Sequence, residues 1–311
     1  MSRRLYRIDQ SCDVVLTYSP IIEITGHLFE CFDYYLFLSG RYRVRILLFD
    51  GLPDAALQTA FESKYKASFD DVLPDIDRVD GASRDSPVDV YVPPNTFLLM
   101  TDGNFKAAGY NGTHFMARRL YGFLCEPDPG DLPGMPRNVT YLQDYRIYGK
   151  NRLHCSVDYV KKLPFAQYRP CADVDPSLGM MYMTYVCRKV GPDVVADYFR
   201  RSGCRSAELV VPYRLKEYDG IPGVEQAVAP VPDFFDRFGT YIYLPVPRRL
   251  DCSPRLVTEC YMRRKRVFMD LDYSDPGLET RRADAERDLS SLDLGDGDGI
   301  LDVIEEYRRG S

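Results

Sequence analysis

The chain has 311 residues and a formal net charge of −6, and 45% of its residues are hydrophobic and 28% are charged. This composition is typical of a globular protein, and the length predicts roughly two domains of about 150 residues each. The acidic balance argues against a histone-like nucleic-acid binder, because such proteins are usually basic.

The first half of the chain predicts alternating strands and helices. Residues 13–18 predict a buried strand, and Leu28, Phe32 and Leu36 then recur at helical spacing. Residues 43–51 predict the next strand, which completes a unit with the length of a right-handed parallel crossover. The prolines in the run 85–94 favour an edge or irregular strand there, since proline cannot donate a hydrogen bond to a strand ladder. The further expected elements are a helix at 54–65, that edge strand at 85–94, a strand at 95–103 and a helix at 112–124.

A segment dense in proline, glycine and aspartate at 125–138 is the best candidate linker, and the pattern restarts after it. Runs rich in aromatic and aliphatic residues predict strands at 152–160, 180–188, 207–213, 239–245 and 266–271. Segments of helical length lie among them at 191–203 and 253–264. This alternation predicts an α/β fold with a parallel or mostly parallel sheet in each half. We place an N-terminal domain at 1–140, a C-terminal domain at 141–280 and a charged linker and helix at 281–311.

The cysteine and histidine content argues against a disulfide framework and a histidine-rich metal site. The nine cysteines are scattered and include no Cys-x-x-Cys pair, and only three histidines are present. No run approaches the roughly 18 apolar residues of a membrane span. The first residues also lack the apolar core of a signal peptide. We therefore expect a cytoplasmic protein without a membrane span.

Ligands of parallel α/β sheets bind beyond the carboxyl ends of the strands, which draws attention to Arg188 and Lys189. Both follow a predicted strand, and Pro192 then suits the first position of a helix. Two cations beside a helix N-terminus are suited to binding phosphate. A salt bridge at the strand edge is the alternative role.

The segment 251–270 combines similar features. Ser253 suits a helix N-cap and Pro254 the first helical position, so free amides there offer a place for a diphosphate. Arg255 and Glu259 are four residues apart and share a helix face. Glu259 is positioned to accept hydrogen bonds from ribose or sugar hydroxyls. The alternative is that Arg255 and Glu259 simply pair on a helix surface.

The run 241–269, YIYLPVPRRLDCSPRLVTECYMRRKRVFM, resembles the donor-side segment of GT-B glycosyltransferases, in which two Rossmann-like domains face a cleft. The resemblance implies that amides near Ser253 contact the diphosphate of a nucleotide sugar, with a UDP-sugar favoured. It implies that Glu259 contacts the ribose or the transferred sugar and that Arg188 and Lys189 neutralise the phosphates. It also implies that a C-terminal helix packs back on the N-terminal domain.

The same resemblance extends to the N-terminal SPIIEITGHLFE, where Gly26 would allow close approach to substrate. One departure concerns the spaced glutamate pair of many family members, since the position eight after Glu259 is Val267. The division of labour between ribose and sugar therefore stays open.

Glycosyl transfer needs cations for the leaving diphosphate, and an inverting enzyme also needs a general base. Asp102, at the end of a predicted N-terminal strand, is the first candidate base, although aspartate is also a common turn residue. His27 and Glu30 are alternatives, and His114 is a weaker one. The resemblance implies a metal-independent enzyme without a tightly bound cofactor.

The acceptor is the least constrained part of the hypothesis. The soluble phage DNA glucosyltransferases share the GT-B fold, and the 24 tyrosines and 16 phenylalanines of this chain would include some able to stack on an extruded base. The basic runs Arg118–Arg119 and 263–266 would follow phosphates. We favour 5-hydroxymethylpyrimidine in double-stranded DNA over a saccharide or small molecule. A non-catalytic nucleotide-binding or structural protein is the contrasting hypothesis.

The acidic tail at 293–307 approximates an EF-hand calcium loop, but its first ligand position falls on Leu294. We prefer to interpret it as an acidic turn that caps a helix at 300–309.

Overall fold

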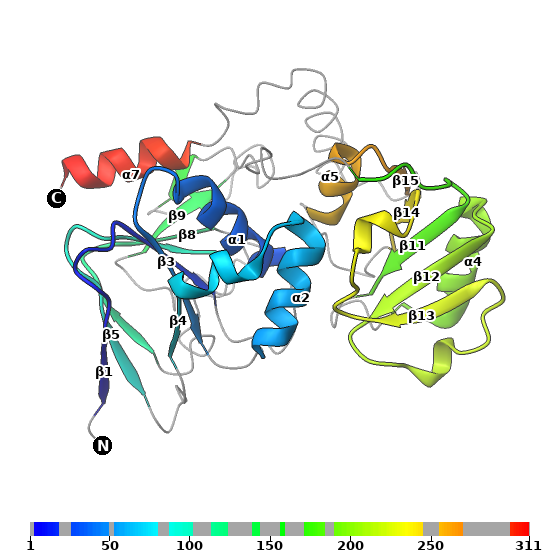
Figure 1. The fold of residues 1–311 in the computed structure, drawn as a ribbon, viewed down its shortest axis with the longest axis horizontal. Helices are drawn as coiled ribbons and strands as arrows, with labels where there is room; N and C mark the ends of the chain where they lie inside the picture. The colour runs from blue at the N-terminus through cyan, green and yellow to red at the C-terminus, as the bar shows by residue number, and fades with distance from the viewer. Residues whose placement is uncertain are drawn as a thin grey trace.

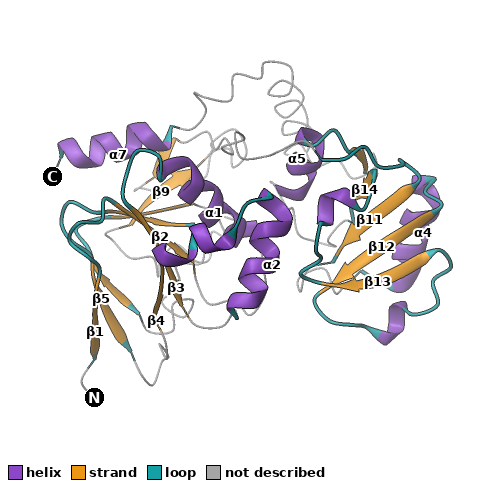
Figure 2. Cartoon of the chain, viewed as in Figure 1, coloured by secondary structure: helices purple, strands orange, loops and turns teal. Residues whose placement is uncertain are grey.

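The computed structural model describes eleven stretches of the chain: residues 3–18, 26–49, 53–79, 87–101, 113–123, 139–143, 156–158, 171–183, 190–244, 255–269 and 299–310. These stretches form three β-sheets with helices packed against the two larger ones (Figures 1 and 2). Every strand pair in the described residues is parallel. The predicted α/β class with parallel sheets is therefore confirmed.

The largest sheet has seven strands in the order β10-β9-β8-β6-β2-β3-β4. Its strands are β2 (Val14–Tyr18), β3 (Val44–Phe49), β4 (Ile76–Val79), β6 (Phe97–Met100), β8 (Leu120–Phe123), β9 (Val139–Gln143) and β10 (Ser156–Asp158). Numbered by their sequence order within this sheet, they lie as 3-2-1-4-5-6-7, which is the order of a Rossmann fold. The sheet continues past residue 140, where we had placed the domain boundary.

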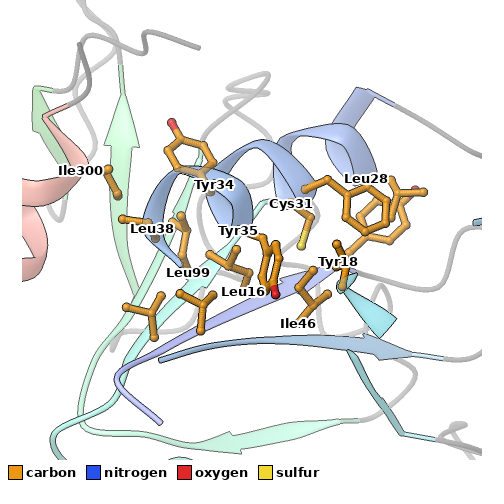
Figure 3. Close-up of a cluster of buried hydrophobic side chains, with 14 of the residues drawn as sticks. Leu16, Tyr18, Leu28, Cys31, Tyr34, Tyr35, Leu38, Ile46, Leu99 and Ile300 are labelled. Atoms are coloured by element: carbon orange, nitrogen blue, oxygen red, sulfur yellow. The ribbon is translucent and has the colours of Figure 1, made fainter. Parts of the chain in front are cut away.

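One face of this sheet is covered by helices α1 (Gly26–Leu38), α2 (Asp54–Tyr65) and α7 (Ile300–Arg309). Of the predicted stripe, Leu28 and Phe32 are buried and Leu36 is partly buried, and Leu38 joins them in the core with Leu16 and Ile46 (Figure 3 shows most of these residues). Alternate strand residues face the other way, as the two-residue repeat of a strand requires. In the described residues, that second face packs on a further sheet.

The second-face sheet has three strands in the order β1-β5-β7: β1 (Arg4–Arg7), β5 (Val88–Tyr91) and β7 (His114–Met116). It corrects two expectations. The strand expected as an edge or irregular strand at 85–94 is instead the central strand β5, whose ladder lies between Pro87 and Pro93. The expected helix at 112–124 is wrong: β7 and β8 occupy that stretch and pair in different sheets. Strand pairing with distant segments here overrides the local pattern.

The C-terminal sheet has five strands in the order β13-β12-β11-β14-β15. They are β11 (Leu178–Tyr182), β12 (Ser206–Val211), β13 (Val224–Val228), β14 (Thr240–Ile242) and β15 (Arg266–Phe268). Renumbered in chain order, the sheet reads 3-2-1-4-5, again a Rossmann order. Helix α4 (Pro192–Ser202) covers one face and α5 (Arg255–Met262) the other. The doubly wound arrangement follows from these two opposite crossovers.

Helix α7, near the end of the chain, packs against the N-terminal sheet. Tyr307 packs against the rings of Phe97 and Tyr121 and donates a hydrogen bond of 2.7 Å to the carbonyl of Pro94. Arg308 also pairs with Asp13 at 2.6 Å. The last helix is thus an integral part of the N-terminal domain.

Candidate functional site: the junction of two sheet edges

The strand order of the C-terminal sheet reverses between β11 and β14, which pair at Gly179–Thr240 and Met180–Tyr241. Ligands of doubly wound sheets bind beyond the carboxyl ends of the strands at such a reversal. Arg188 and Lys189 follow β11 in sequence, and Ser253 and Pro254 follow β14. These four residues lie outside the described residues, as does the side chain of Arg255, the first residue of α5. The sequence-predicted donor residues thus belong to the two segments that flank the reversal.

The N-terminal sheet reverses in the same way between β2 and β6. Gly26 and His27 open α1, the helix that follows β2, and Asp102 comes two residues after the end of β6. Asp102 and the side chain of His27 lie outside the described residues. The candidate bases therefore also follow the two strands that border a reversal.

Thr17, the next-to-last residue of β2, marks this reversal with a polar side chain. The hydroxyl of Thr101 donates to the Thr17 carbonyl at 3.2 Å, which ties the ends of β2 and β6 together. The Thr17 hydroxyl oxygen is fully buried and has no hydrogen-bond partner in the described part of the chain. Buried polar atoms are normally paired, so this hydroxyl is an exception within the described part of the chain.

The carboxyl edges of the two large sheets meet at one junction. Past the end of β13, the carbonyl of Val231 accepts a 3.0 Å hydrogen bond from Ser63 of α2. On the other side Phe29, in the first turns of α1 after β2, has its ring centroid 3.6 Å from the ammonium of Lys64. Figure 1 shows α2 and α5 lying between the two sheets. Segments that follow the carboxyl ends of both sheets thus come into contact.

Lys64 and Glu259 form a buried ion pair across this junction. The Lys64 ammonium lies 2.5 Å from a Glu259 carboxylate oxygen, and the two side chains are 6% and 1% exposed. Arg263, one turn after Glu259, donates a 2.7 Å hydrogen bond to the backbone carbonyl of Lys64. Glu259, the carboxylate expected to contact the nucleotide sugar, is therefore paired in this structure with Lys64 of the opposite domain.

The basic run 263–266 alternates between buried and exposed side chains. Arg263 and Lys265 are buried, whereas Arg264 and Arg266 are exposed. Arg263 stacks 4.2 Å from the ring centroid of Phe235, and Lys265 donates to the carbonyl of Ala172 at 3.1 Å. Of the four cations expected to follow phosphates on the surface, Arg263 instead contacts the opposite domain and Lys265 is buried within its own domain.

A second ionic contact lies at the rim of the junction. Lys66, the left-handed C-cap of α2, pairs with Asp233 and with Asp236, the latter at 2.7 Å. Partial burial alone would raise the pKa of Asp236. Hydrogen bonds from Lys66 and from the amide of Ala172 outweigh burial and hold that pKa below its usual value. The rim pair is therefore ionised at neutral pH.

The remaining acceptor-side residues lie in two places. Glu30 is buried in α1, close in sequence to Asp33, which accepts a 2.6 Å hydrogen bond from Tyr65 of α2. Arg118 and Arg119 are exposed between β7 and β8, and Arg119 donates to the Tyr121 hydroxyl at 3.4 Å. Glu30 thus belongs to the helix at the junction, while the arginine pair lies beside α7.

Sequence reasoning missed Lys64, which the structure places at the centre of the junction. The buried face of α2 includes Leu57, Ala60 and Phe61, and Lys64 continues this stripe three and four residues further on. The sequence signal that could have identified Lys64 is a cation on an apolar helical stripe, since a buried lysine needs a partner.

Comparisons with known proteins give no relative: no protein-family model, curated protein or solved structure matches the chain. No helix in the described residues is long and apolar enough to cross a membrane. Within the same stretches, no group of three or more histidine, cysteine or acidic side chains is placed to hold a metal ion.

Proposed function

We propose that the protein is a GT-B-type glycosyltransferase that moves a sugar from a nucleotide sugar to a hydroxyl acceptor. The observation that supports this best is the meeting of two parallel sheets at their carboxyl edges, each with a Rossmann strand order. Each such edge is suited to a ligand at its strand reversal. Two facing edges offer one position for a donor and one for an acceptor.

The C-terminal edge is the proposed donor side. Arg188 and Lys189 would neutralise the diphosphate, and amides at Ser253 and Pro254 would bind its oxygens at the start of α5. Glu259 would accept hydrogen bonds from ribose or sugar hydroxyls. A UDP-sugar is the favoured donor.

The N-terminal edge is the proposed acceptor side. In an inverting reaction Asp102 would take the proton of the acceptor hydroxyl, with His27 as the alternative base. Cationic stabilisation of the leaving diphosphate by Arg188 and Lys189 would supply the electrostatic part of catalysis without a metal. The favoured acceptor is 5-hydroxymethylpyrimidine in double-stranded DNA, for which exposed Arg118 and Arg119 would offer phosphate contacts. A saccharide or small-molecule acceptor is the alternative.

Thermal-shift measurements with UDP, GDP and their sugars test the donor assignment. We expect a UDP-sugar to raise the melting temperature, because a ligand that binds only the folded state stabilises it by mass action. Arg188→Ala should abolish this shift. Arg200→Ala is the matched control, since Arg200 is an exposed arginine near the C-terminal end of α4, where it pairs with Asp197. An unchanged melting temperature with every nucleotide sugar would show that the protein does not bind a nucleotide sugar as proposed.

The acceptor is tested separately by mass spectrometry of hydroxymethylated DNA incubated with protein and UDP-sugar. The expected result is a gain of one hexose mass per modified base. Sugar transfer to a saccharide but not to this DNA would keep the enzyme class and replace the acceptor.

A further inference from the structure

Glu259 is held by Lys64 in this structure, although the proposed function assigns it to the nucleotide sugar. Resting on that function, we propose that the Lys64–Glu259 ion pair is a releasable contact between the two domains. The pair holds the donor-free arrangement, and the nucleotide sugar takes the place of Lys64 at Glu259. Donor binding is thereby coupled to separation or sliding of the domains.

The polar contacts described between the domains are concentrated at one end of α2. Ser63, Lys64 and Lys66 supply them from the N-terminal side, within four consecutive positions. Their partners are the segment 231–236 and helix α5 with its C-terminal turn. A contact centred on one helix end permits rotation about that point more readily than a broad interface, because few side chains must repack.

Lys64 and Glu259 each have another interaction partner when the ion pair separates. The Lys64 ammonium already lies 3.6 Å from the ring centroid of Phe29, in its own domain, so it keeps a cation–π partner without Glu259. Glu259 sits one turn after the start of α5, whose first residues follow β14 at the strand reversal. Release therefore leaves a carboxylate at the edge where the donor is proposed to bind.

Burial of the ion pair limits the net free energy by which it holds the two domains together. Removing two charges from water offsets much of their mutual attraction, so a buried pair adds little net stability while strongly fixing one geometry. A nucleotide sugar brings hydroxyl donors for Glu259 together with phosphate contacts elsewhere on the same edge. The ligand thus replaces one contact with several.

Small-angle X-ray scattering and titration with UDP-glucose test the proposal on the full chain. Lys64→Met removes the competing cation, and Lys64→Gln is a milder variant in case the first does not fold. In the absence of donor, we expect both variants to have a larger radius of gyration than the wild type. UDP-glucose should bind them about tenfold more tightly, because a larger fraction of molecules is competent to bind.

Two controls separate this mechanism from a general loss of structure. Lys216→Met changes an exposed lysine of the C-terminal domain and should match the wild type in both measurements. Glu259→Gln should expand the protein like Lys64→Met but weaken UDP-glucose binding, since it removes the acceptor carboxylate.

A folded Lys64→Met protein with wild-type scattering, or with wild-type or weaker donor affinity, would overturn the proposal. If no variant and no wild-type protein binds a nucleotide sugar, the proposed function fails. In that case the scattering comparison alone decides whether Lys64 holds the domains together.

Discussion

Among single residues, position 239 requires glycine, because the backbone of a neighbouring segment lies against it. A Cβ at this position would lie 2.5 Å from the carbonyl oxygens of Val174 and Asp175, which cannot move as a flexible side chain would. We expect Gly239→Ala to lower the free energy of unfolding by about 1–3 kcal/mol, the usual range for overpacking. Urea denaturation measures this change.

Gly40→Ala is the control for that variant. A Cβ at Gly40 would meet no atom within 4 Å, so we expect an effect close to zero. Equal stability of the two variants would show that the segment 174–175 does not lie against Gly239.

The cysteines described by the structure divide into protected and accessible thiols. Burial raises the pKa of Cys12 to about 12, and burial followed by the charge of Glu259 raises the pKa of Cys260 well above its usual value. Thiolate is the reactive form, so at pH 8 we expect iodoacetamide to leave both residues unmodified in the folded protein. Half-buried Cys171 and Cys204 should react faster.

Peptide mapping by mass spectrometry after timed alkylation distinguishes these sites. Modification of Cys260 as fast as Cys204 would mean that α5 does not pack on the sheet as described. Full labelling of all four thiols in denaturant is the control.

Sequence patterns propose some candidate site residues and not others for a physical reason. Asp102 and Arg188, which lie outside the described residues, are candidates because each follows a strand in sequence, which depends only on local pattern and the rule for parallel sheets. The partner of Glu259 depends on how two domains meet, and no local pattern contains that contact. Sequence patterns therefore do not predict that Lys64 contacts Glu259. Its position on the apolar stripe of α2 indicates only that it is buried and needs a partner.

Helix α7 packs on the N-terminal core through the buried side chains of Ile300, Ile304 and Tyr307. Tyr307 is buried, and its hydroxyl donates to the carbonyl of Pro94. We expect Tyr307→Phe to lower the free energy of unfolding by about 1 kcal/mol through the lost hydrogen bond. Tyr307→Ala should cost about 3–5 kcal/mol, because it also leaves a cavity beside Phe97 and Tyr121.

Chemical denaturation of both variants tests the docking of α7. Asp302→Ala, in the first turn of the same helix, is a nearby surface control. A Tyr307→Ala protein as stable as the wild type would show that α7 does not contribute to the N-terminal core.

The elements that sequence patterns predicted well are those with a long, regular apolar repeat. Helices α2, α4 and α7 begin and end within two residues of their expected positions. The prediction of a helix at 112–124 is wrong because two short strands, with three residues between them, together have the length of a helix. Strand β1 was not expected at all, since its exposed, arginine-rich sequence becomes a strand only by pairing with β5.

At the scale of the whole molecule, alternation of strands and helices predicted two parallel α/β units. It did not predict the strand orders, because the neighbour of each strand is chosen by packing between segments far apart in the chain. The observed orders place the reversal of each sheet next to segments already singled out by sequence. The site proposed at the junction rests on this placement and on the rule for ligands of parallel sheets.

Hydrogen exchange measured by mass spectrometry, with and without saturating UDP-glucose, tests whether a nucleotide sugar binds where the two sheet edges meet. We expect slower exchange with ligand at the ends of β11 and β14 and in the first turn of α5, with no change in β1, β5 or β7. Identical exchange with and without UDP-glucose, or protection confined to the three-stranded sheet, would contradict a nucleotide-sugar site where the two sheet edges meet.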